Sequence, residues 1–132
     1  MGRKKITLID MKFGRWVDKI AGRQFRPLYS GDTWAPAVDC YEDDANFYMI
    51  ADLAGVIPEA IDLEISGQVL TISGVRPSPA IDQPVGNVRL HVMEIDHGRF
   101  SRDLPIPDNA DSGAISAVYR HGLLWIRLPK RT

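Results

Sequence analysis

From position 34 onward, apolar residues alternate with polar ones in a series of short runs. Successive side chains of a β-strand point to opposite faces of a sheet, so each alternating run presents one apolar face to a core. Eight runs of this kind, separated by turn-forming residues, predict an all-β chain folded as a two-sheet sandwich. The apolar positions of the runs are Val38 and Cys40; Phe47, Met49, Ala51 and Leu53; Ile61, Leu63 and Ile65; Leu70 and Ile72; Val88, Leu90 and Val92; Phe100 and Leu104; Ile115, Ala117 and Tyr119; and Leu124, Ile126 and Leu128.

Glycines and prolines between the runs supply the expected turns. Gly67 and Gln68 separate two runs with glycine in the first position, as a type II′ hairpin requires. His121 and Gly122 separate the last two runs, and glycine there permits a positive φ. Residues 76–87 are rich in proline, glycine and short polar side chains, which predicts a long loop between the fourth and fifth runs.

The segment before position 35 follows a different pattern. Its apolar residues recur at spacings of three and four, which predicts a short amphipathic helix. Gly14 and Gly22 weaken this helix. We therefore expect a flexible, partly helical arm over residues 1–34, followed by a sandwich domain over residues 35–130. The apolar residues of the helical pattern are Phe13, Trp16, Val17 and Ile20.

The composition excludes several classes of protein. The formal net charge is -1, so the chain creates no field that would gather nucleic acid or anionic membrane. No stretch approaches the roughly 20 apolar residues of a membrane span, and no signal peptide follows the basic start. Cys40 is the single cysteine, so no intrachain disulfide is expected and a reducing cytoplasm is the expected location.

Residues able to carry catalysis are scattered along the chain. His91, His97 and His121 belong to different elements, and none stands at a metal-ligand spacing from another ligand. Acidic residues at positions 39–44 lack the glycine and distal glutamate of a calcium loop, and a solvated turn explains them better. We therefore expect no enzyme activity, no metal and no cofactor, although a catalytic pair assembled in space from distant strands stays open.

Four motifs occur in order between residues 34 and 130. Residues 34–39 read Trp-x-Pro-x-x-Asp, and residues 52–74 carry an alternating pattern that starts with Asp-Leu-Ala-Gly. Residues 94–102 read Glu-x-x-x-Gly-x-Phe-x-Arg, and residues 117–124 contain a Gly-x-Leu signature. This ordered set covers about three-quarters of the chain and resembles the small heat shock protein (alpha-crystallin) family. Ala54 stands where that family often has proline.

The resemblance implies an immunoglobulin-like sandwich that dimerises. In the bacterial and plant branch of the family, a strand in the long loop pairs with the partner's first strand. Residues 88–92 would cross and residues 38–42 would receive them, the alternative being a loop that folds back on its own sheet. Arg102 would contact the partner, with Glu94 as its candidate counterpart, or would lie at the sandwich rim with its head in water. The expected dimer-interface residues are Val38, Cys40, Glu42, Arg89, Leu90, Val92, Glu94 and Arg102.

The resemblance also implies a groove between two strands, where family members dock an Ile-x-Ile/Val motif from a C-terminal tail. Here the sequence stops two residues after Lys130, which puts large tail-linked oligomers in doubt. Ile6, Thr7 and Leu8 resemble the motif, so we expect the arm to dock there, in cis or between dimers, the alternative being an unstructured tail. The groove would be lined by Ile61, Leu63, Ile65, Ile115, Ala117 and Tyr119, and the arm residues that dock or bind clients would be Ile6, Leu8, Phe13, Trp16, Val17, Ile20 and Phe25.

The expected function is that of an ATP-independent chaperone that holds partly unfolded clients and prevents their aggregation. Apolar side chains of the arm and groove would cover the apolar surface of a client, and such burial yields about 25 cal/mol per Å². The expected partners are a second copy of the chain, in a homodimer or larger oligomer, and the clients themselves. Two alternatives stay open: a CS-type co-chaperone module, and a sandwich enzyme or carbohydrate-binding domain.

Overall fold

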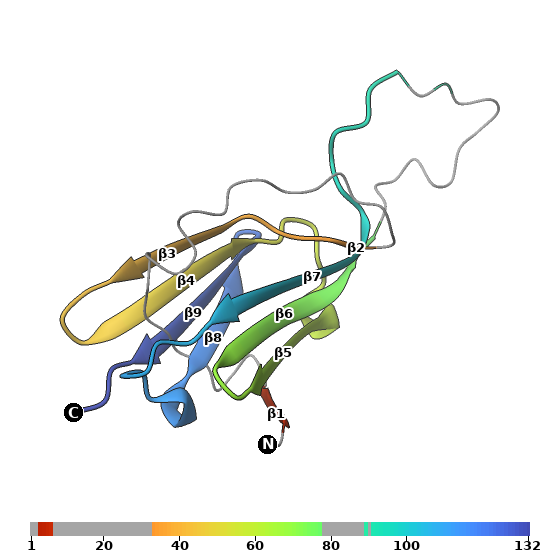
Figure 1. Ribbon diagram of the computed structural model, residues 1–132. Coiled ribbons are helices and arrows are strands. Elements are labelled where there is room, and N and C mark those ends of the chain that lie inside the picture. The colour runs from red at the N-terminus through yellow and green to blue at the C-terminus, as the bar shows by residue number, and fades with distance from the viewer. Residues whose placement is uncertain (1–2, 7–32, 78–88, 90) are drawn as a thin grey trace.

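The computed structural model describes residues 3–6, 33–77, 89 and 91–132, which form two β-sheets packed face to face (Figure 1). The strands are β1 Arg3–Ile6, β2 Thr33–Trp34, β3 Val38–Glu42, β4 Asn46–Asp52, β5 Ile61–Ser66, β6 Val69–Arg76, β7 Gly98–Pro105, β8 Ser116–Arg120 and β9 Leu123–Pro129. The five-stranded sheet has the order β1-β5-β6-β7-β2, and the four-stranded sheet has the order β3-β4-β9-β8. Short 3-10 turns at Pro58–Ala60 and Ser112–Ala114 connect the two sheets.

Burial alternates along the strands in step with the sequence. In β4, Phe47, Met49 and Ala51 are buried, while the residues between them are half-buried. The inward side chains of both sheets form one apolar core, and no polar side chain of the described residues is buried in it. The predicted all-β, two-sheet sandwich is therefore confirmed.

Seven of the eight predicted runs correspond to strands, although Leu53 lies one residue after β4 and Ile115 one residue before β8. In the remaining run, Val88 and Leu90 lie outside the described residues, and Arg89, His91 and Val92 belong to neither sheet of the single chain. The alternation did not indicate β1 or β2, which lie at opposite ends of the five-stranded sheet. The predicted arm helix lies outside the described residues.

Two tight hairpins have the predicted glycine geometry. Gly67 has a φ of 62° at the first position of the turn between β5 and β6. His121 and Gly122 have φ values of 54° and 78° between β8 and β9. Positive φ at both central residues is the type I′ geometry, whose twist matches that of the flanking strands.

Trp34 joins the start of the sandwich to the core. Its strand, β2, runs parallel to β7 and places Trp34 opposite Phe100. The two rings are tilted with centroids 5.4 Å apart, and the indole Nε1 of Trp34 donates a hydrogen bond to the carbonyl of Gly98. Trp34 is only 6% exposed, so it packs with the sandwich although it precedes the predicted domain boundary by one residue.

Candidate functional site

Strand β3 forms an outer border of the four-stranded sheet (Figure 1). It pairs with β4 on one side, and within the described residues no strand pairs with its other side. Such a border presents backbone N–H and C=O groups that another strand can satisfy. Val38 and Cys40 are half-buried against the core, and Glu42 is exposed. These three predicted interface residues therefore lie along one open edge.

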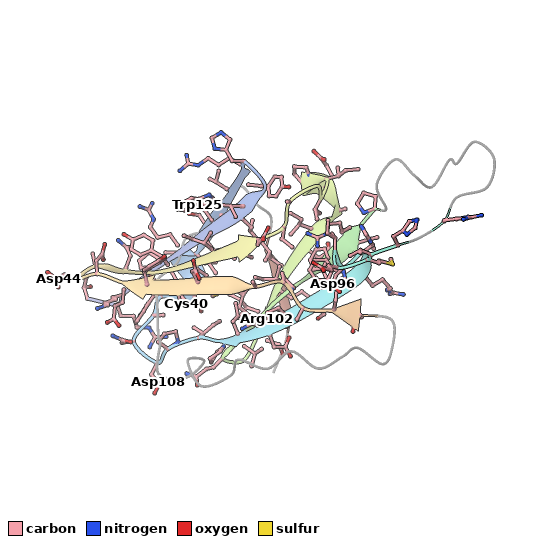
Figure 2. The ribbon with its side chains drawn as sticks, turned by 90° about the horizontal axis from the view of Figure 1, so that it is seen from above. Cys40, Asp44, Asp96, Arg102, Asp108 and Trp125 are labelled. Atoms are coloured by element: carbon pink, nitrogen blue, oxygen red, sulfur yellow. The ribbon has the colours of Figure 1, made fainter. Side chains whose placement is uncertain are left out.

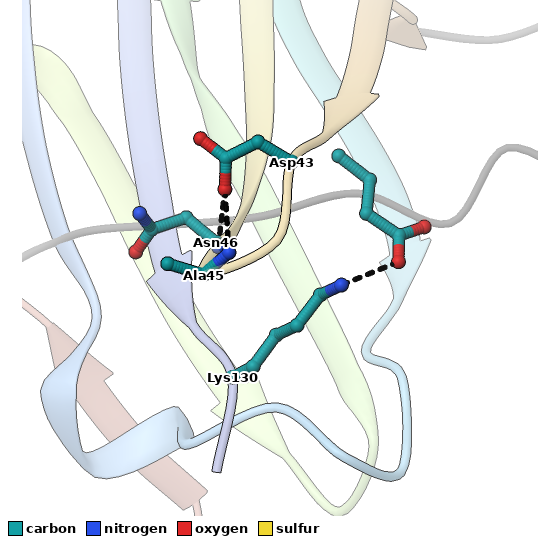
Figure 3. A network of polar contacts seen from close by, with 5 residues as sticks. Asp43, Ala45, Asn46 and Lys130 are labelled. Carbon is teal, nitrogen blue, oxygen red and sulfur yellow. Dashed lines mark hydrogen bonds and ion pairs between the residues drawn. The ribbon is translucent and has the colours of Figure 1, made fainter. Parts of the chain in front are cut away.

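A compact polar turn ends this edge. One carboxylate oxygen of Asp43 accepts hydrogen bonds from the backbone N–H groups of Ala45 and Asn46, at 2.8 and 2.6 Å (Figure 3). The other accepts a 2.6 Å bond from the hydroxyl of Tyr48. These hydrogen bonds, that of Tyr48 first, hold the pKa of Asp43 below its ordinary value, and the same bond raises the pKa of Tyr48. The acidic residues here thus build a hairpin, as predicted.

The residue that follows β9 holds the same turn in place. Lys130 forms a 2.7 Å ion pair with Glu42 (Figure 3). The ammonium of Lys130 also lies 5.3 Å from the centroid of the Phe47 ring. Its backbone N–H donates to the carbonyl of Ala45. The tip of the β3–β4 hairpin is therefore held to the last strand, which keeps the open edge in a defined position.

The segment that leads into β7 leaves the sandwich at the opposite end from this hairpin (Figure 1). Figure 2 shows Asp96 where this segment rejoins the sheet and Asp44 at the tip of the distant hairpin. Predicted interface residues Arg89, Val92 and Glu94 are exposed, and Leu90 lies outside the described residues. The large apolar side chains exposed in this segment are Val92 at 71%, Met93 at 65% and Ile95 at 64%.

Arg102 lies on β7 between the buried residues Phe100 and Leu104. Its side chain is half-buried, and Nη1 donates a 2.8 Å hydrogen bond to the carbonyl of Pro36. This bond ties the five-stranded sheet to the segment that immediately precedes the open β3 edge. The structure thus gives Arg102 a role within one chain, and its predicted contact with a partner stays a prediction.

The residues predicted to line the groove lie on β5 and on or next to β8. β8 is an outer strand of its sheet, whereas β5 lies beside the outer strand β1. Five of the groove residues face the core and are at most 7% exposed, whereas Tyr119 is half-buried and donates a hydrogen bond to the carbonyl of Leu53. In the single chain these five side chains therefore belong to the core, and their contact with a docked segment stays a prediction. The five buried residues are Ile61, Leu63, Ile65, Ile115 and Ala117.

The arm pairs with β5 through β1. The antiparallel register places Lys4 opposite Ile65 and Ile6 opposite Leu63. Ile6 is thus the one residue of the predicted docking motif within the described part of the chain, and it pairs with a predicted groove strand. The other arm residues singled out lie outside the described residues: Leu8, Phe13, Trp16, Val17, Ile20 and Phe25.

Two further contacts could not be predicted from the alternation of apolar and polar residues. On the outer face of the four-stranded sheet, Trp125 is 37% exposed, and the guanidinium of Arg120 lies 5.2 Å from its ring centroid (Figure 2). Arg76, at the end of β6, contacts Trp34 and two loops. Neither contact has a signal in the sequence, because each depends on how separate strands pack.

The described residues contain neither a candidate metal cluster nor a membrane-spanning helix. No three His, Cys, Asp or Glu side chains among them are placed to hold a metal ion. None of the helices in the described part of the chain is long and apolar enough to cross a membrane. The features that the structure does present are open backbone edges and exposed apolar side chains, which suit contacts with other polypeptides.

The chain is similar to a known family and to solved structures. Residues 39–132 match the family model described as the Hsp20/alpha crystallin family. Small heat shock protein C4 of Rickettsia felis is 28% identical over 127 residues, covering 96% of this chain and 76% of that protein. The probable 15 kDa heat shock protein of Leptospira interrogans is 34% identical over 97 residues, covering 74% and 71%. The crystal structure of a small heat-shock protein from Xylella fastidiosa has a TM-score of 0.66 at 35% identity, covering 76% and 89%.

Proposed function

The chain belongs to the Hsp20/alpha crystallin family, and from this premise we propose that it holds partly unfolded clients as a strand-exchanged homodimer without ATP. It is a small heat shock chaperone, as its relatives are, which disfavours the CS-type alternative. One observation supports the proposal of a dimer: the described part of the chain has both a β3 edge without a strand partner and a projecting segment rich in exposed apolar side chains.

Strand addition supplies the physical reason for dimerisation. Residues 88–92 alternate apolar and polar side chains, as a strand does, yet the described members of this run pair with none of the described strands. A second copy offers the β3 edge, where pairing would satisfy open N–H and C=O groups. By symmetry each chain gives one strand and receives one. The proposed interface consists of Val38, Cys40, Glu42, Arg89, Leu90, Val92, Glu94 and Arg102.

Arg102 would act at this interface through its present position. Its hydrogen bond to Pro36 lies just before the receiving strand, so an approaching carboxylate could share the same guanidinium. Glu94 is exposed on the projecting segment and would supply that carboxylate from the partner. A charge-assisted hydrogen bond of this kind would help to fix the register of the exchanged strand against β3. The other contacts of this interface are backbone hydrogen bonds and apolar side chains.

Client binding would use apolar surface that lies outside the core. In the described residues, Met93 and Ile95 are each more than half exposed. Apolar arm residues of the sequence would extend this surface, among them Phe13 and Trp16. Burial of a few hundred Å² at about 25 cal/mol per Å² gives several kcal/mol before the entropy of association is subtracted. Such binding needs no nucleotide or metal and fits a protein that is not an enzyme and acts in the cytoplasm.

The border at β5 and β8 would be a second binding site. Strand β1 already pairs with β5, which supports the proposal that the arm docks at this border in cis. The residues proposed to form the groove remain Ile61, Leu63, Ile65, Ile115, Ala117 and Tyr119, and the arm residues Ile6 and Leu8 would occupy it.

The dimer is tested by native mass spectrometry of the full chain. Replacing residues 88–92 by a five-residue Gly-Ser sequence should yield monomers at concentrations where the wild type is dimeric. The matched control replaces residues 79–83 of the same loop by the same Gly-Ser sequence and should stay dimeric. If the chain were still dimeric after replacement of residues 88–92, the strand-exchange proposal would be wrong.

Holding activity is tested separately by heating a client such as citrate synthase without ATP. The wild-type chain should suppress light scattering by the aggregating client in proportion to its concentration. A monomeric chain that leaves the scattering unchanged would favour the CS-type alternative and contradict the proposed function.

A further inference from the structure

Arg76 stands at the neck of the projecting loop. It is the last residue of β6 and pairs with Gly98, the first residue of β7. Its Nε donates a 2.9 Å hydrogen bond to the carbonyl of Asp96, twenty residues later. The main chain of Arg76 therefore opens the loop, while its side chain holds the returning end.

The same guanidinium contacts two other parts of the sandwich. Nη1 donates a 3.2 Å hydrogen bond to the carbonyl of Ala54 in the turn between β4 and β5. The guanidinium carbon lies 4.2 Å from the centroid of the Trp34 ring, and Trp34 in turn donates to the carbonyl of Gly98. Arg76 thus joins the end of the arm, a turn from the four-stranded sheet and both ends of the loop.

The contacts are specific for arginine. A guanidinium is planar, presents donors in fixed directions and stacks on an aromatic ring, whereas a lysine ammonium is a single point of charge. The two acceptors are backbone carbonyls in different segments, and the ring occupies a face of the same group. Lysine would keep the charge but would not make all three contacts together.

We propose that Arg76 is a positioning residue that closes the neck of the 77–97 loop and couples the position of Trp34 to exchange of the loop with a partner. This inference rests on the proposed strand exchange. A loop held at its neck samples fewer directions, so less conformational entropy is lost when its strand pairs with the partner's edge.

The coupling is reciprocal. If a displaced arm moves Trp34 away from Arg76, the neck loosens and the dimer weakens; if the loop is captured by a partner, Trp34 is held more firmly. Thermodynamic linkage requires that the Trp34–Arg76 contact stabilises the dimer by the same free energy by which the dimer stabilises that contact. Arg76 would then connect the arm, which is proposed to bind clients, with the strand exchange that forms the dimer.

The first test compares R76K and R76A with the control R99A in the full chain. Arg99 is an exposed cation on the adjacent strand, opposite Val75, so R99A removes a similar charge without opening the neck. We expect the dimer dissociation constant to rise roughly tenfold in R76K and further in R76A, and to stay near the wild-type value in R99A. Sedimentation velocity at several concentrations measures these constants.

The second test monitors Trp34 directly. In a chain carrying W16F and W125F, Trp34 is the only tryptophan. Adding R76K should red-shift its emission and increase quenching by acrylamide, and hydrogen exchange of the amides of residues 91–97 should become faster. Both signals are compared at a concentration at which both chains are monomeric, because capture of the loop by a partner would also change them. Circular dichroism with an unchanged β-sheet spectrum shows that R76K still folds.

The outcomes separate the two proposals. A wild-type chain that is monomeric rejects the strand-exchanged dimer, while altered Trp34 emission and faster loop exchange in R76K would still support the neck closure. A dimeric wild type whose R76K variant keeps its affinity, its Trp34 emission and its loop protection would overturn the role of Arg76 and leave the dimer intact.

Discussion

The hydroxyl of Tyr48 donates a 2.6 Å hydrogen bond to the carboxylate of Asp43 across the turn that joins β3 to β4. The same carboxylate accepts two backbone N–H groups of the turn (Figure 3). All three hydrogen bonds favour the ionised form of Asp43 and lower its pKa. Protonation of Asp43 therefore weakens the hydrogen bonds that stabilise this hairpin.

Replacement of Asp43 should destabilise the fold in a pH-dependent manner. The pKa of Asp43 is lower in the folded chain than its ordinary value of 3.8, so its stabilising effect is complete above that value. The effect is lost as the pH falls through the folded-state pKa. Urea denaturation should therefore show D43A to be less stable than wild type at neutral pH, with a difference that shrinks in acid.

Asp44 provides the control for this experiment. It is an exposed neighbour in the same turn, so D44A removes an equal charge without removing the hydrogen bonds of Asp43. We expect D44A to unfold at nearly the same urea concentration as wild type throughout. A difference between D43A and wild type that stays constant down to strongly acidic pH would contradict the assigned role.

Patterns among neighbouring residues in the sequence were sufficient to predict this hairpin and the sandwich as a whole. Ile61, Leu63 and Ile65 alternate with polar residues because one face of β5 is buried, and the same rule located most of the other strands. His121 and Gly122 revealed their turn because few residues accept a positive φ. In both cases the information lies within a few neighbouring residues.

Contacts between distant segments could not be predicted in this way. Trp34 pairs with β7 and stacks on Arg76 only because the sheets bring these segments together, and no spacing in the sequence specifies such a contact. The alternation placed Arg102 on an inward face but left two roles open. Its hydrogen bond to a carbonyl 66 residues away emerged only from the packed structure.

Gly74 should tolerate no side chain. A Cβ at this position would lie 2.4 Å from the carbonyl oxygen of Ala60 and 2.7 Å from the Phe100 ring. The backbone of Ala60 and the packed ring of Phe100 cannot both move away from a Cβ. We therefore expect G74A to lower the free energy of unfolding by about 3 kcal/mol. Thermal unfolding of the variant measures the loss.

Gly67 offers a comparison with free space around it. Its φ is 62°, but a Cβ there would meet no atom within 4 Å. G67A should thus lower the free energy of unfolding by about 1 kcal/mol, the cost of a positive φ in alanine. If the two variants unfolded at the same temperature, close packing around Gly74 would not be what excludes a side chain.

Arg102 should stabilise each chain independently of any partner. Its hydrogen bond to Pro36 involves a charged donor and is half-buried, so R102A should lower the free energy of unfolding by about 2 kcal/mol. R127A, on an exposed position of β9, is the control and should change stability by less than about 0.5 kcal/mol. Equal losses in the two variants would show that the bond to Pro36 contributes nothing specific.

Strand β1 should protect the border of the five-stranded sheet at β5. Lys5 lies opposite Glu64 in the antiparallel pairing, and proline at this position would remove a backbone N–H and disfavour the strand. We expect K5P, like deletion of residues 1–9, to accelerate hydrogen exchange in β5 and to change the assembly size seen by native mass spectrometry, because an exposed edge recruits other strands. K12P makes the same substitution outside β1 and should leave both measurements unchanged. Unaltered exchange and assembly size in K5P would mean that β1 does not cover this edge in solution.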